Sequence, residues 1–338
     1  MERSYLIGFD LGGTKMLCVI LDPDYEVVAR TKVKVGADRD NETILKSMIE
    51  AVEAALKEAE IDKGALESIG VVSPGPIDVE NGIVLETPNL DLNNFPVRDA
   101  LEKEFGCPVL LENDVNAGTY GEFIRGAGAG YRHVVGIFPG TGVGGGLILD
   151  GKLFRGATGG AGEIGHITIE PDGPKCGCGN YGCLEQMASR TAIAKELVGL
   201  VISGESRVIR ESAGTDIAKV KSKTILKAVQ AGEEAVIEVV QRAARYMGMG
   251  MAAAVNIFDP ELIILGGGLI EKLGDFYVEE AERSMRRHAM RGLVSHVDVR
   301  QAQLGDDAAV VGAAALAHEE AGKRAQDGKP DRASREDE

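Results

Sequence analysis

The chain has 338 residues, of which 44% are hydrophobic and 27% are charged, as expected for a globular protein with room for two domains. Its formal net charge of −16 argues against binding nucleic acid through a broad basic surface. Trp is absent and aromatic residues make up only 4%, so an aliphatic core rich in Gly and Ala is expected, which suits α/β packing.

The N-terminal part of the chain predicts a β-hairpin followed by alternating helix and strand. Residues 5–10 and 16–21 are apolar strand-like runs joined by a glycine-rich turn. Residues 41–60 have the apolar spacing of an amphipathic helix. Residues 69–73 and 109–112 are short apolar runs that end in polar residues, Gly or Pro, and both are predicted to be strands.

An internal repeat relates two parts of the chain. Gly8–Asp22 aligns without a gap to Gly136–Asp150, and both segments have the pattern strand, glycine turn, strand. The repeat predicts two related domains whose glycine turns face each other across a cleft. We expect a small N-terminal α/β domain at residues 1–113, completed by a C-terminal helix at 301–320, and a larger α/β domain at 114–300.

The C-terminal part is predicted to be mainly helical. Residues 191–201 and 223–257 contain good helix formers, and residues 261–265 form a buried strand that is followed by three glycines. Residues 308–319 read as an Ala-rich helix. Residues 321–338 are charged and poor in apolar residues, which predicts a disordered tail.

The first glycine turn, DLGGTK, predicts a phosphate-binding loop. Gly12 and Gly13 allow backbone N–H groups to point into a concavity that can hold a phosphate. Lys15 adds positive charge, and Asp10 is placed to hold Mg²⁺ through water. The alternative is an ordinary glycine-rich hairpin. A second glycine turn at 140–146 favours phosphate binding, because two facing turns can hold the phosphates of a nucleotide.

The segment LENDVN places Asn113 and Asp114 directly after a predicted strand. The carboxyl end of such a strand is where α/β proteins expose catalytic groups. An Asp here can accept the proton of an attacking hydroxyl in phosphoryl transfer, and Asn113 can bind a neighbouring hydroxyl. The alternative is an Asx turn or an N-cap for the following helix.

Residues 163–185, EIGHITIEPDGPKCGCGNYGCLE, predict a metal site. The spacing H-x9-C-x-C-x4-C supplies a closed set of four Zn²⁺ ligands, which are His166, Cys176, Cys178 and Cys183. No position remains for a catalytic water, so the zinc is expected to be structural. The alternative is a packed histidine beside free thiols. Three clustered cysteines in an odd total of five favour metal over disulfides, and therefore a reducing cytosol.

These motifs occur together, in the same order, in a known family. DLGGTK, SPGP, PNL, ENDVN, PGTGVGGG, EIGH, CGCGNYGCLE and FDPELIILGGG make the chain resemble the ROK family (repressor, open reading frame, kinase) from about Ile7 to Leu316. The resemblance is greatest to its bacterial ATP-dependent glucokinases. It implies an α/β fold of two ribonuclease H-like domains, of the actin and hexokinase type, flanking a cleft. Many ROK proteins are repressors with an N-terminal helix-turn-helix, for which the start of the first motif at Asp10 leaves no room.

The resemblance also implies particular roles for individual residues. Asp114 is expected to be the catalytic base for the sugar 6-hydroxyl. The sugar-binding positions are expected to be Gly75, Asn89, Asn113, Asp114, Glu163, His166 and Glu185, with His166 serving both zinc and sugar. The ATP-binding positions are expected to be Asp10, Gly12, Gly13, Thr14, Lys15, Gly140, Thr141, Gly142, Gly266, Gly267 and Gly268.

The expected activity is transfer of the γ-phosphoryl group of ATP, with Mg²⁺, to the 6-hydroxyl of a hexose, most readily glucose. The alternatives are N-acetylmannosamine, N-acetylglucosamine, mannose or fructose as acceptor, polyphosphate as donor, or a sugar-sensing protein without turnover. No nucleic-acid partner is expected because of the net charge of −16, and no membrane partner is expected because no apolar run reaches transmembrane length. The cysteine pattern predicts a cytoplasmic protein, and the resemblance implies a homo-oligomer, either a dimer or a tetramer.

Overall fold

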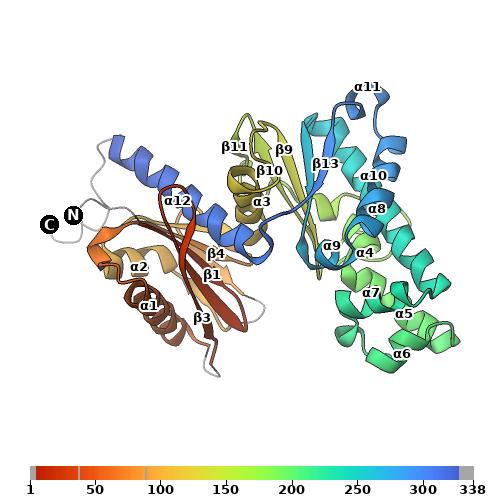
Figure 1. Ribbon diagram of the computed structural model, residues 1–338, viewed down its shortest axis with the longest axis horizontal. Helices are drawn as coiled ribbons and strands as arrows, with labels where there is room; N and C mark the ends of the chain where they lie inside the picture. Colours follow the sequence, from red (N-terminus) through yellow and green to blue (C-terminus); the bar gives the residue numbers. More distant parts are fainter. Residues whose placement is uncertain (1–4, 37–38, 88–89, 327–338) are drawn as a thin grey trace. The chain divides into compact units, whose positions relative to one another are not determined.

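The computed structural model describes residues 5–36, 39–87 and 90–326, which divide into two compact units (Figure 1). The first unit comprises Met1–Ala129 and Asp306–Glu338, and the second comprises Gly130–Gly305. The first unit therefore extends beyond the boundary expected at residue 113. It does so because helix α3 (Asp114–Arg125) packs along helix α12 (Ala308–Gln326).

The first unit is built on a five-stranded sheet in the order β3-β2-β1-β4-β8. Strands β1, β2 and β3 are antiparallel, as the predicted hairpin requires, whereas β1, β4 and β8 are parallel. The strand bounds are β1 Tyr5–Leu11, β2 Lys15–Leu21, β3 Val27–Lys34, β4 Leu66–Ser73 and β8 Val109–Asn113. A separate three-stranded sheet consists of β5 Ile77–Asp78, β6 Ile83–Glu86 and β7 Asn93–Phe95.

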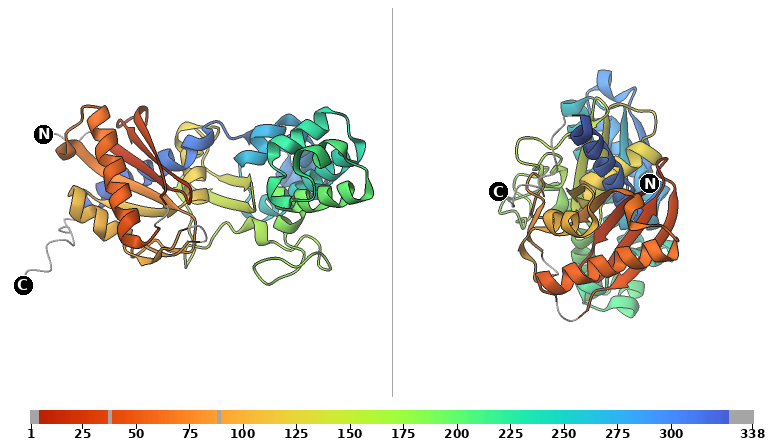
Figure 2. Two further views of the ribbon diagram at one scale, coloured as in Figure 1. Left: turned by 90° about the horizontal axis from the view of Figure 1, so that it is seen from below. Right: turned by 90° about the vertical axis from the view of Figure 1, so that its left-hand side faces the viewer.

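Helices cover both faces of this sheet. Helices α1 (Asn41–Glu58) and α2 (Val97–Phe105) pack on the face that carries the apolar core, whereas α12 lies on the other face, as Figure 2 shows. The α12 face is glycine-lined. A Cβ on Gly8 would lie 2.0 Å from the carbonyl oxygen of Val310, and one on Gly70 would lie 2.0 Å from that of Ala313. The chain thus brings a C-terminal helix onto an N-terminal sheet through direct backbone packing.

The second unit repeats the plan of the first, with strand order β11-β10-β9-β12-β13. Strands β9, β10 and β11 are antiparallel, and β9, β12 and β13 are parallel, so strand directions match those of the first sheet. The bounds are β9 Val134–Pro139, β10 Val143–Leu149, β11 Lys152–Leu153, β12 Leu262–Leu265 and β13 Asp298–Gln301. The matching topology agrees with the internal repeat in the sequence.

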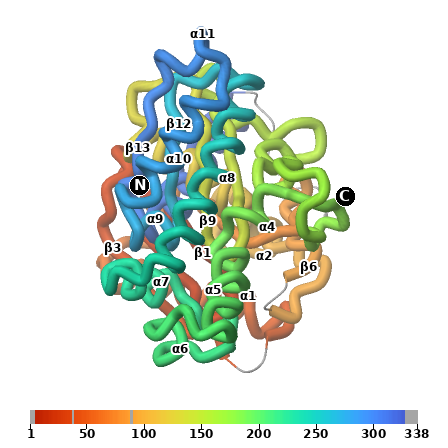
Figure 3. Tube along the Cα trace, turned by 90° about the vertical axis from the view of Figure 1, so that its right-hand side faces the viewer, coloured from red at the N-terminus to blue at the C-terminus, as the bar shows by residue number. Residues whose placement is uncertain are grey.

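The helices of the second unit follow the strand pair and the metal loop (Figure 3). Their bounds are α4 Leu184–Ala188, α5 Arg190–Ser203, α6 Arg207–Ala213, α7 Ser222–Gln230, α8 Glu234–Phe258, α9 Gly267–Leu273, α10 Asp275–His288 and α11 Arg291–Val294. The most extensive packing between helices of this unit is that of α8 on α10, where Gly248 packs against the backbone of Ala281. None of the helices in the described ranges combines the length and apolar character needed to cross a lipid bilayer.

Four segments differ from the sequence-based expectation. The C-terminal helix expected at 301–320 begins only at Ala308, because β13 extends to Gln301. Residues 223–257 form two helices, because Gly232 has φ of +75° and ends the first of them. The second glycine turn is shorter than expected, since β10 already begins at Val143. Residues 321–326 continue α12 as helix and are not part of a disordered tail; residues 327–338 lie outside the described residues.

Candidate functional site

Two acidic residues lie at the carboxyl-terminal ends of parallel strands in the first unit's sheet. Asp10 is near the end of β1, and Asp114 begins α3 directly after β8. Burial, then the Asp114 charge, then the Asp306 charge raise the pKa of Asp10 to about 6. Burial also raises the pKa of Asp114, against the opposing effect of a 2.9 Å hydrogen bond that its Oδ1 accepts from the Val115 N–H. Two carboxyl groups close enough to interact electrostatically are suited to hold a cation and a proton.

Asn113 caps helix α3. Its Oδ1 accepts hydrogen bonds from the N–H groups of Val115 (2.9 Å) and Asn116 (3.2 Å). The cap predicted as the alternative reading is therefore present. The side-chain amide group remains able to donate a hydrogen bond, so capping leaves Asn113 available to a sugar hydroxyl.

Glu112 is a fully buried acid in the same motif that sequence reasoning missed. Its Oε1 accepts hydrogen bonds from the Asn113 N–H (3.0 Å) and from Nδ2 of Asn116 (3.2 Å). It thereby fixes the backbone that precedes Asp114. The sequence signal was a Glu at the end of an apolar strand, where an unpaired charge is strongly disfavoured.

The first glycine turn connects β1 and β2. A Cβ on Gly12 would lie 2.5 Å from the carbonyl oxygen of Lys15, so the turn requires glycine there. The Val35 N–H donates a 3.1 Å hydrogen bond to the Thr14 carbonyl and holds the turn from the next strand. Gly13 is half-buried, and Thr14 and Lys15 are exposed and accessible to a ligand.

The predicted sugar loop of the first unit is only partly covered by the structure. Gly75 lies just after β4, in the connection to β5, on the same side of the sheet as the end of β8. Asn89 lies outside the described residues.

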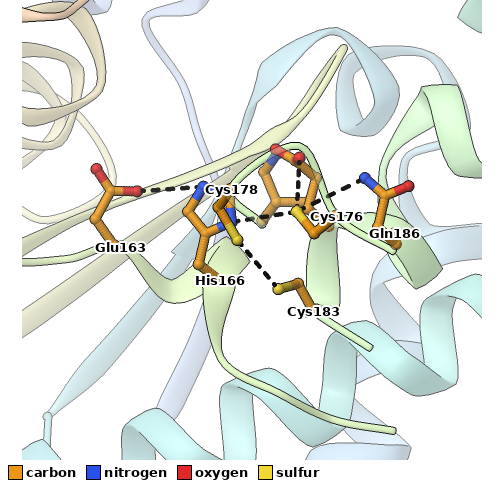
Figure 4. Close-up of polar contacts among 8 residues, drawn as sticks. Glu163, His166, Cys176, Cys178, Cys183 and Gln186 are labelled. Atoms are coloured by element: carbon orange, nitrogen blue, oxygen red, sulfur yellow. Dashed lines mark hydrogen bonds and ion pairs between the residues drawn. The ribbon is translucent and has the colours of Figure 1, made fainter. Parts of the chain in front are cut away.

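The four predicted zinc ligands come together in the second unit (Figure 4). The ligand atoms of His166, Cys176, Cys178 and Cys183 all lie within 4.8 Å of one another. Nδ1 of His166 is 3.6 Å from Sγ of Cys176, and Sγ of Cys178 is 3.7 Å from Sγ of Cys183. In a tetrahedron with Zn–S bonds of about 2.3 Å, neighbouring sulfurs are about 3.8 Å apart. The donor set and its spacing therefore fit zinc.

The backbone around the ligands is an irregular hairpin with isolated bridges between Thr168 and Cys183 and between Lys175 and Tyr181. Gly182, with φ of +66°, lies so close to the Glu170 carbonyl that a Cβ would be 1.5 Å from its oxygen. Cys183 is fully buried, and burial raises the pKa of its thiol. A bound cation would reverse this effect by stabilising the thiolates.

His166 faces the cluster with one ring nitrogen and Glu163 with the other. Nε2 lies 3.8 Å from Oε2 of Glu163, whose side chain is 66% exposed. An imidazole held through Nδ1 has its ring orientation fixed, which leaves Nε2 to bind another group. The geometry is compatible with the dual role that the resemblance implies for His166.

Glu185 connects the metal cluster to the second glycine turn. Its Oε1 is 3.8 Å from Sγ of Cys176, and its Oε2 accepts a 3.2 Å hydrogen bond from the Val143 N–H. A Cβ on Gly142 would lie 2.3 Å from the same oxygen. The sequence predicted a sugar ligand at this position and gave no sign of its contact with the turn.

Two further residues that the sequence analysis missed hold this turn. The Arg190 N–H donates to the Gly140 carbonyl (2.9 Å), and its guanidinium donates to Oγ1 of Thr141 (2.7 Å). The hydroxyl of Thr191 donates to the Thr141 carbonyl (2.6 Å). Both residues follow the metal loop by one short helix, α4, so proximity to the CGCGNYGCLE motif was the available signal.

The third predicted glycine segment joins β12 to α9. Gly266 packs against Phe138, where a Cβ would lie 2.6 Å from its Cε1, and Gly267 has φ of +79°. Strand β12 runs parallel to β9, so Gly266–Gly268 and Gly140–Gly142 follow neighbouring strands at one sheet edge. The structure thus brings the predicted glycine segments of this unit together.

A pocket of about 350 Å³ lies elsewhere in the second unit, between α8 and α10. Its lining includes Arg242, Arg245, Tyr246, Glu280 and Arg287. None of the predicted site residues that the structure describes lines it. Its cations are balanced in part by carboxylates, since Glu280 pairs with both Arg245 and Arg283.

Comparison with known proteins gives a consistent assignment. Residues 6–320 match the ROK family. The chain is 34% identical over 324 residues to a glucokinase of Thermotoga maritima, covering 95% of this chain and 100% of that one. Among solved structures, a ROK family glucokinase from Streptomyces griseus in complex with glucose and AMPPNP superposes with a TM-score of 0.76 at 34% identity, covering 93% of this chain and 99% of that one.

Relatives of a second kind are also present. A xylose repressor of Caldicellulosiruptor bescii is 32% identical over 312 residues, which cover 92% of this chain and 77% of the repressor. Overall likeness therefore does not separate enzyme from regulator, and the site residues must do so.

Proposed function

Because this chain belongs to the ROK family and has its two-unit actin/hexokinase-like fold, we propose that it is an ATP-dependent sugar kinase that phosphorylates the 6-hydroxyl of glucose. The observation that carries the proposal is the placement of Asp10 and Asp114 at the carboxyl ends of parallel strands of the first sheet, next to the Gly12–Lys15 turn. A sugar sensor has no chemical need for two interacting carboxyl groups beside a phosphate loop.

Asp114 acts as the general base in this proposal. Its carboxylate accepts the proton of the attacking hydroxyl, while Asn113 holds a neighbouring hydroxyl of the same sugar. Helix α3 fixes both residues at its first turn, and buried Glu112 fixes the backbone before them. Such positioning accounts for much of the catalysis in phosphoryl transfer.

Asp10 and the two glycine turns serve the phosphoryl donor. Mg²⁺ bound with ATP neutralises charge on the phosphates, and Asp10 is the carboxylate placed to hold it through water. In the first unit, Gly12–Lys15 supplies N–H groups and an ammonium group. In the second unit, Thr141 and Gly142 supply N–H groups, and Gly266–Gly268 is assigned to the adenosine.

The zinc cluster has a structural role in the proposal. Its ligands His166, Cys176, Cys178 and Cys183 hold the loop from which Glu163, His166 and Glu185 bind the sugar hydroxyls. Carboxylates and an imidazole are suitable acceptors and donors for a polyol. The three thiol ligands are compatible with a reducing compartment, and we assign the protein to the cytoplasm.

Turnover with purified protein tests this proposal. Wild-type protein with ATP, Mg²⁺ and glucose is expected to form a sugar 6-phosphate, and Asp114→Asn is expected to lower kcat by about 10³-fold without changing Tm. A panel of glucose, mannose, fructose, N-acetylmannosamine and N-acetylglucosamine, with ATP or polyphosphate, identifies acceptor and donor by kcat/KM.

Absence of turnover with every pair in this panel would contradict the proposal, and so would full activity of Asp114→Asn. Glu67→Gln is a suitable control, because Glu67 is a half-exposed acid of the same unit that pairs with His318. Its kcat is expected to equal that of the wild type.

A further inference from the structure

Arg190 has no assigned role, yet its guanidinium contacts the second glycine turn. It donates a 2.7 Å hydrogen bond to Oγ1 of Thr141, and its backbone N–H donates to the Gly140 carbonyl. Since Thr141 Oγ1 accepts from Arg190, its hydroxyl proton is free to be donated to a ligand.

The turn also has backbone N–H groups that can donate hydrogen bonds to a ligand. The N–H of Gly140 donates within the turn to Gly142, and that of Val143 donates to Glu185. In the ranges 5–36, 39–87 and 90–326, the N–H groups of Thr141 and Gly142 have no protein acceptor. Two N–H groups and a hydroxyl of this turn, together with the remaining N–H groups of the adjacent Arg190 guanidinium, form a donor set that matches an oxyanion.

The charge of Arg190 is also unbalanced. It is the first residue of helix α5, where the helix dipole disfavours a cation. No carboxylate pairs with it in the part of the chain that the structure describes, whereas Arg207, the first residue of α6, pairs with Glu211 at 2.7 Å. An anion at the turn would remove this unfavourable electrostatic energy.

We propose that Arg190 binds the phosphates of the phosphoryl donor at the Thr141–Gly142 turn and supplies positive charge there. The inference rests on the proposed kinase function and extends it to a residue outside the predicted set. A planar guanidinium suits two phosphate oxygens at once, so Arg190→Lys is not a neutral change.

Binding without turnover tests this role. Calorimetric titration with Mg²⁺-AMPPNP and with tripolyphosphate, at two salt concentrations, is compared for the wild type and Arg190→Gln. We expect the Kd of both ligands to rise about tenfold in Arg190→Gln, with a smaller rise in Arg190→Lys and a weaker salt dependence. The Kd for glucose and for adenosine is expected to change less than about twofold.

Two control variants separate charge from structure. Arg207→Gln removes a cation at an equivalent helix position that faces Glu211, and should bind both phosphate ligands as the wild type does. Thr191→Val breaks the hydrogen bond to the Thr141 carbonyl and keeps the charge of Arg190, so it is expected to leave the salt dependence of phosphate binding unchanged. An equal loss of adenosine, glucose and tripolyphosphate binding in Arg190→Gln would assign Arg190 a purely structural role and overturn the proposal.

The outcomes also separate this inference from the kinase assignment. A wild type that phosphorylates a hexose, together with an Arg190→Gln variant that binds tripolyphosphate normally, would refute the role of Arg190 alone. A wild type that binds Mg²⁺-AMPPNP through Arg190 and transfers no phosphoryl group would refute the kinase function alone.

Discussion

Two carboxyl groups with raised pKa values contribute to the pH dependence of the first unit. The pKa of Asp10 is raised to about 6, and that of Asp114 is raised as well, chiefly by burial. Since a raised folded-state pKa means that the fold favours the protonated form, the Asp10 contribution to the free energy of unfolding is present below about pH 4. It is lost as the pH rises through about 6.

Activity is predicted to change in the opposite direction. Both proposed roles require the ionised carboxylate, so kcat/KM should fall as the pH drops below about 6. Initial rates from pH 5 to 9 at constant ionic strength would show this acid limb. A profile that stays flat down to pH 5 would mean that neither ionisation governs the reaction.

Some site residues were predictable one by one and others were not. Asp114 and the zinc ligands belong to short motifs whose spacing directly indicates their chemistry. Arg190, Thr191 and Glu112 act through contacts with backbone groups of other segments, and no local spacing records such contacts. The same limit applies to Glu185, whose contact with Val143 joins residues far apart in the sequence.

Side-chain contacts connect the metal loop to the second glycine turn. Glu185 contacts both Cys176 and Val143, and Arg190 and Thr191 extend the connection to Gly140 and Thr141. Loss of the metal should therefore affect nucleotide binding as well as sugar binding.

Zinc removal tests this connection. Treatment with a zinc chelator, or the substitution Cys183→Ser, is expected to raise the Kd of both glucose and Mg²⁺-AMPPNP at least several-fold and to lower Tm. Metal content by mass spectrometry and calorimetry would be measured on the same sample. Restored binding on adding Zn²⁺ supports the connection, whereas unchanged nucleotide affinity in zinc-free protein would contradict it.

Close packing of α12 on the first sheet depends on glycine. A Cβ at position 70 would lie 2.0 Å from the Ala313 carbonyl oxygen and 2.7 Å from the Ala314 nitrogen, both backbone atoms that cannot move alone. Gly70→Ala is expected to lower the free energy of unfolding by about 1–3 kcal/mol, measured by urea denaturation. Gly118→Ala in α3 is the control, because no atom lies within 4 Å of its Cβ and a helical Ala is expected to be neutral or stabilising.

Element types were easier to predict than element ends. Apolar periodicity located β1, β2, β4, β8 and β12 and the helices α1 and α5, because that pattern follows from burial on one face or both, but it did not predict β3, β13 or α10. It failed at Gly232, where a positive φ divides one predicted helix into two, and at Val143, where strand pairing shortens a glycine-rich turn. It also missed that α12 extends to Gln326, because the charged last turns resemble a solvated tail.

The duplication was visible in the sequence, but the boundary between the units was not. Both sheets have a hairpin followed by parallel strands. The repeated glycine turns in the sequence predicted that the two units are related. The first unit extends to Ala129 because α3 packs against α12, and that contact joins segments almost 200 residues apart, as the bond between Tyr120 and Glu319 illustrates. A repeat identifies equivalent segments and does not show which later segment packs on an earlier one.

The two units are expected to differ in whether each can fold without the rest of the chain. Gly130–Gly305 is continuous and contains its own core, so a fragment of these residues is expected to unfold cooperatively on heating and to bind zinc. A chain cut after Gly305 lacks α12, and we expect rapid amide exchange in β1 and β4, with protection retained in β9 and β12. Full protection of β1 in that truncated chain would show that the first sheet does not need its C-terminal helix.

The position of α12 has a consequence for biosynthesis. A ribosome releases the strands of the first sheet early, yet the helix that covers Gly8 and Gly70 is made only after the whole second unit. The second unit can therefore fold during translation. One face of the first sheet stays uncovered until α12 has been synthesised. The sheet that is synthesised before the second unit is completed after it.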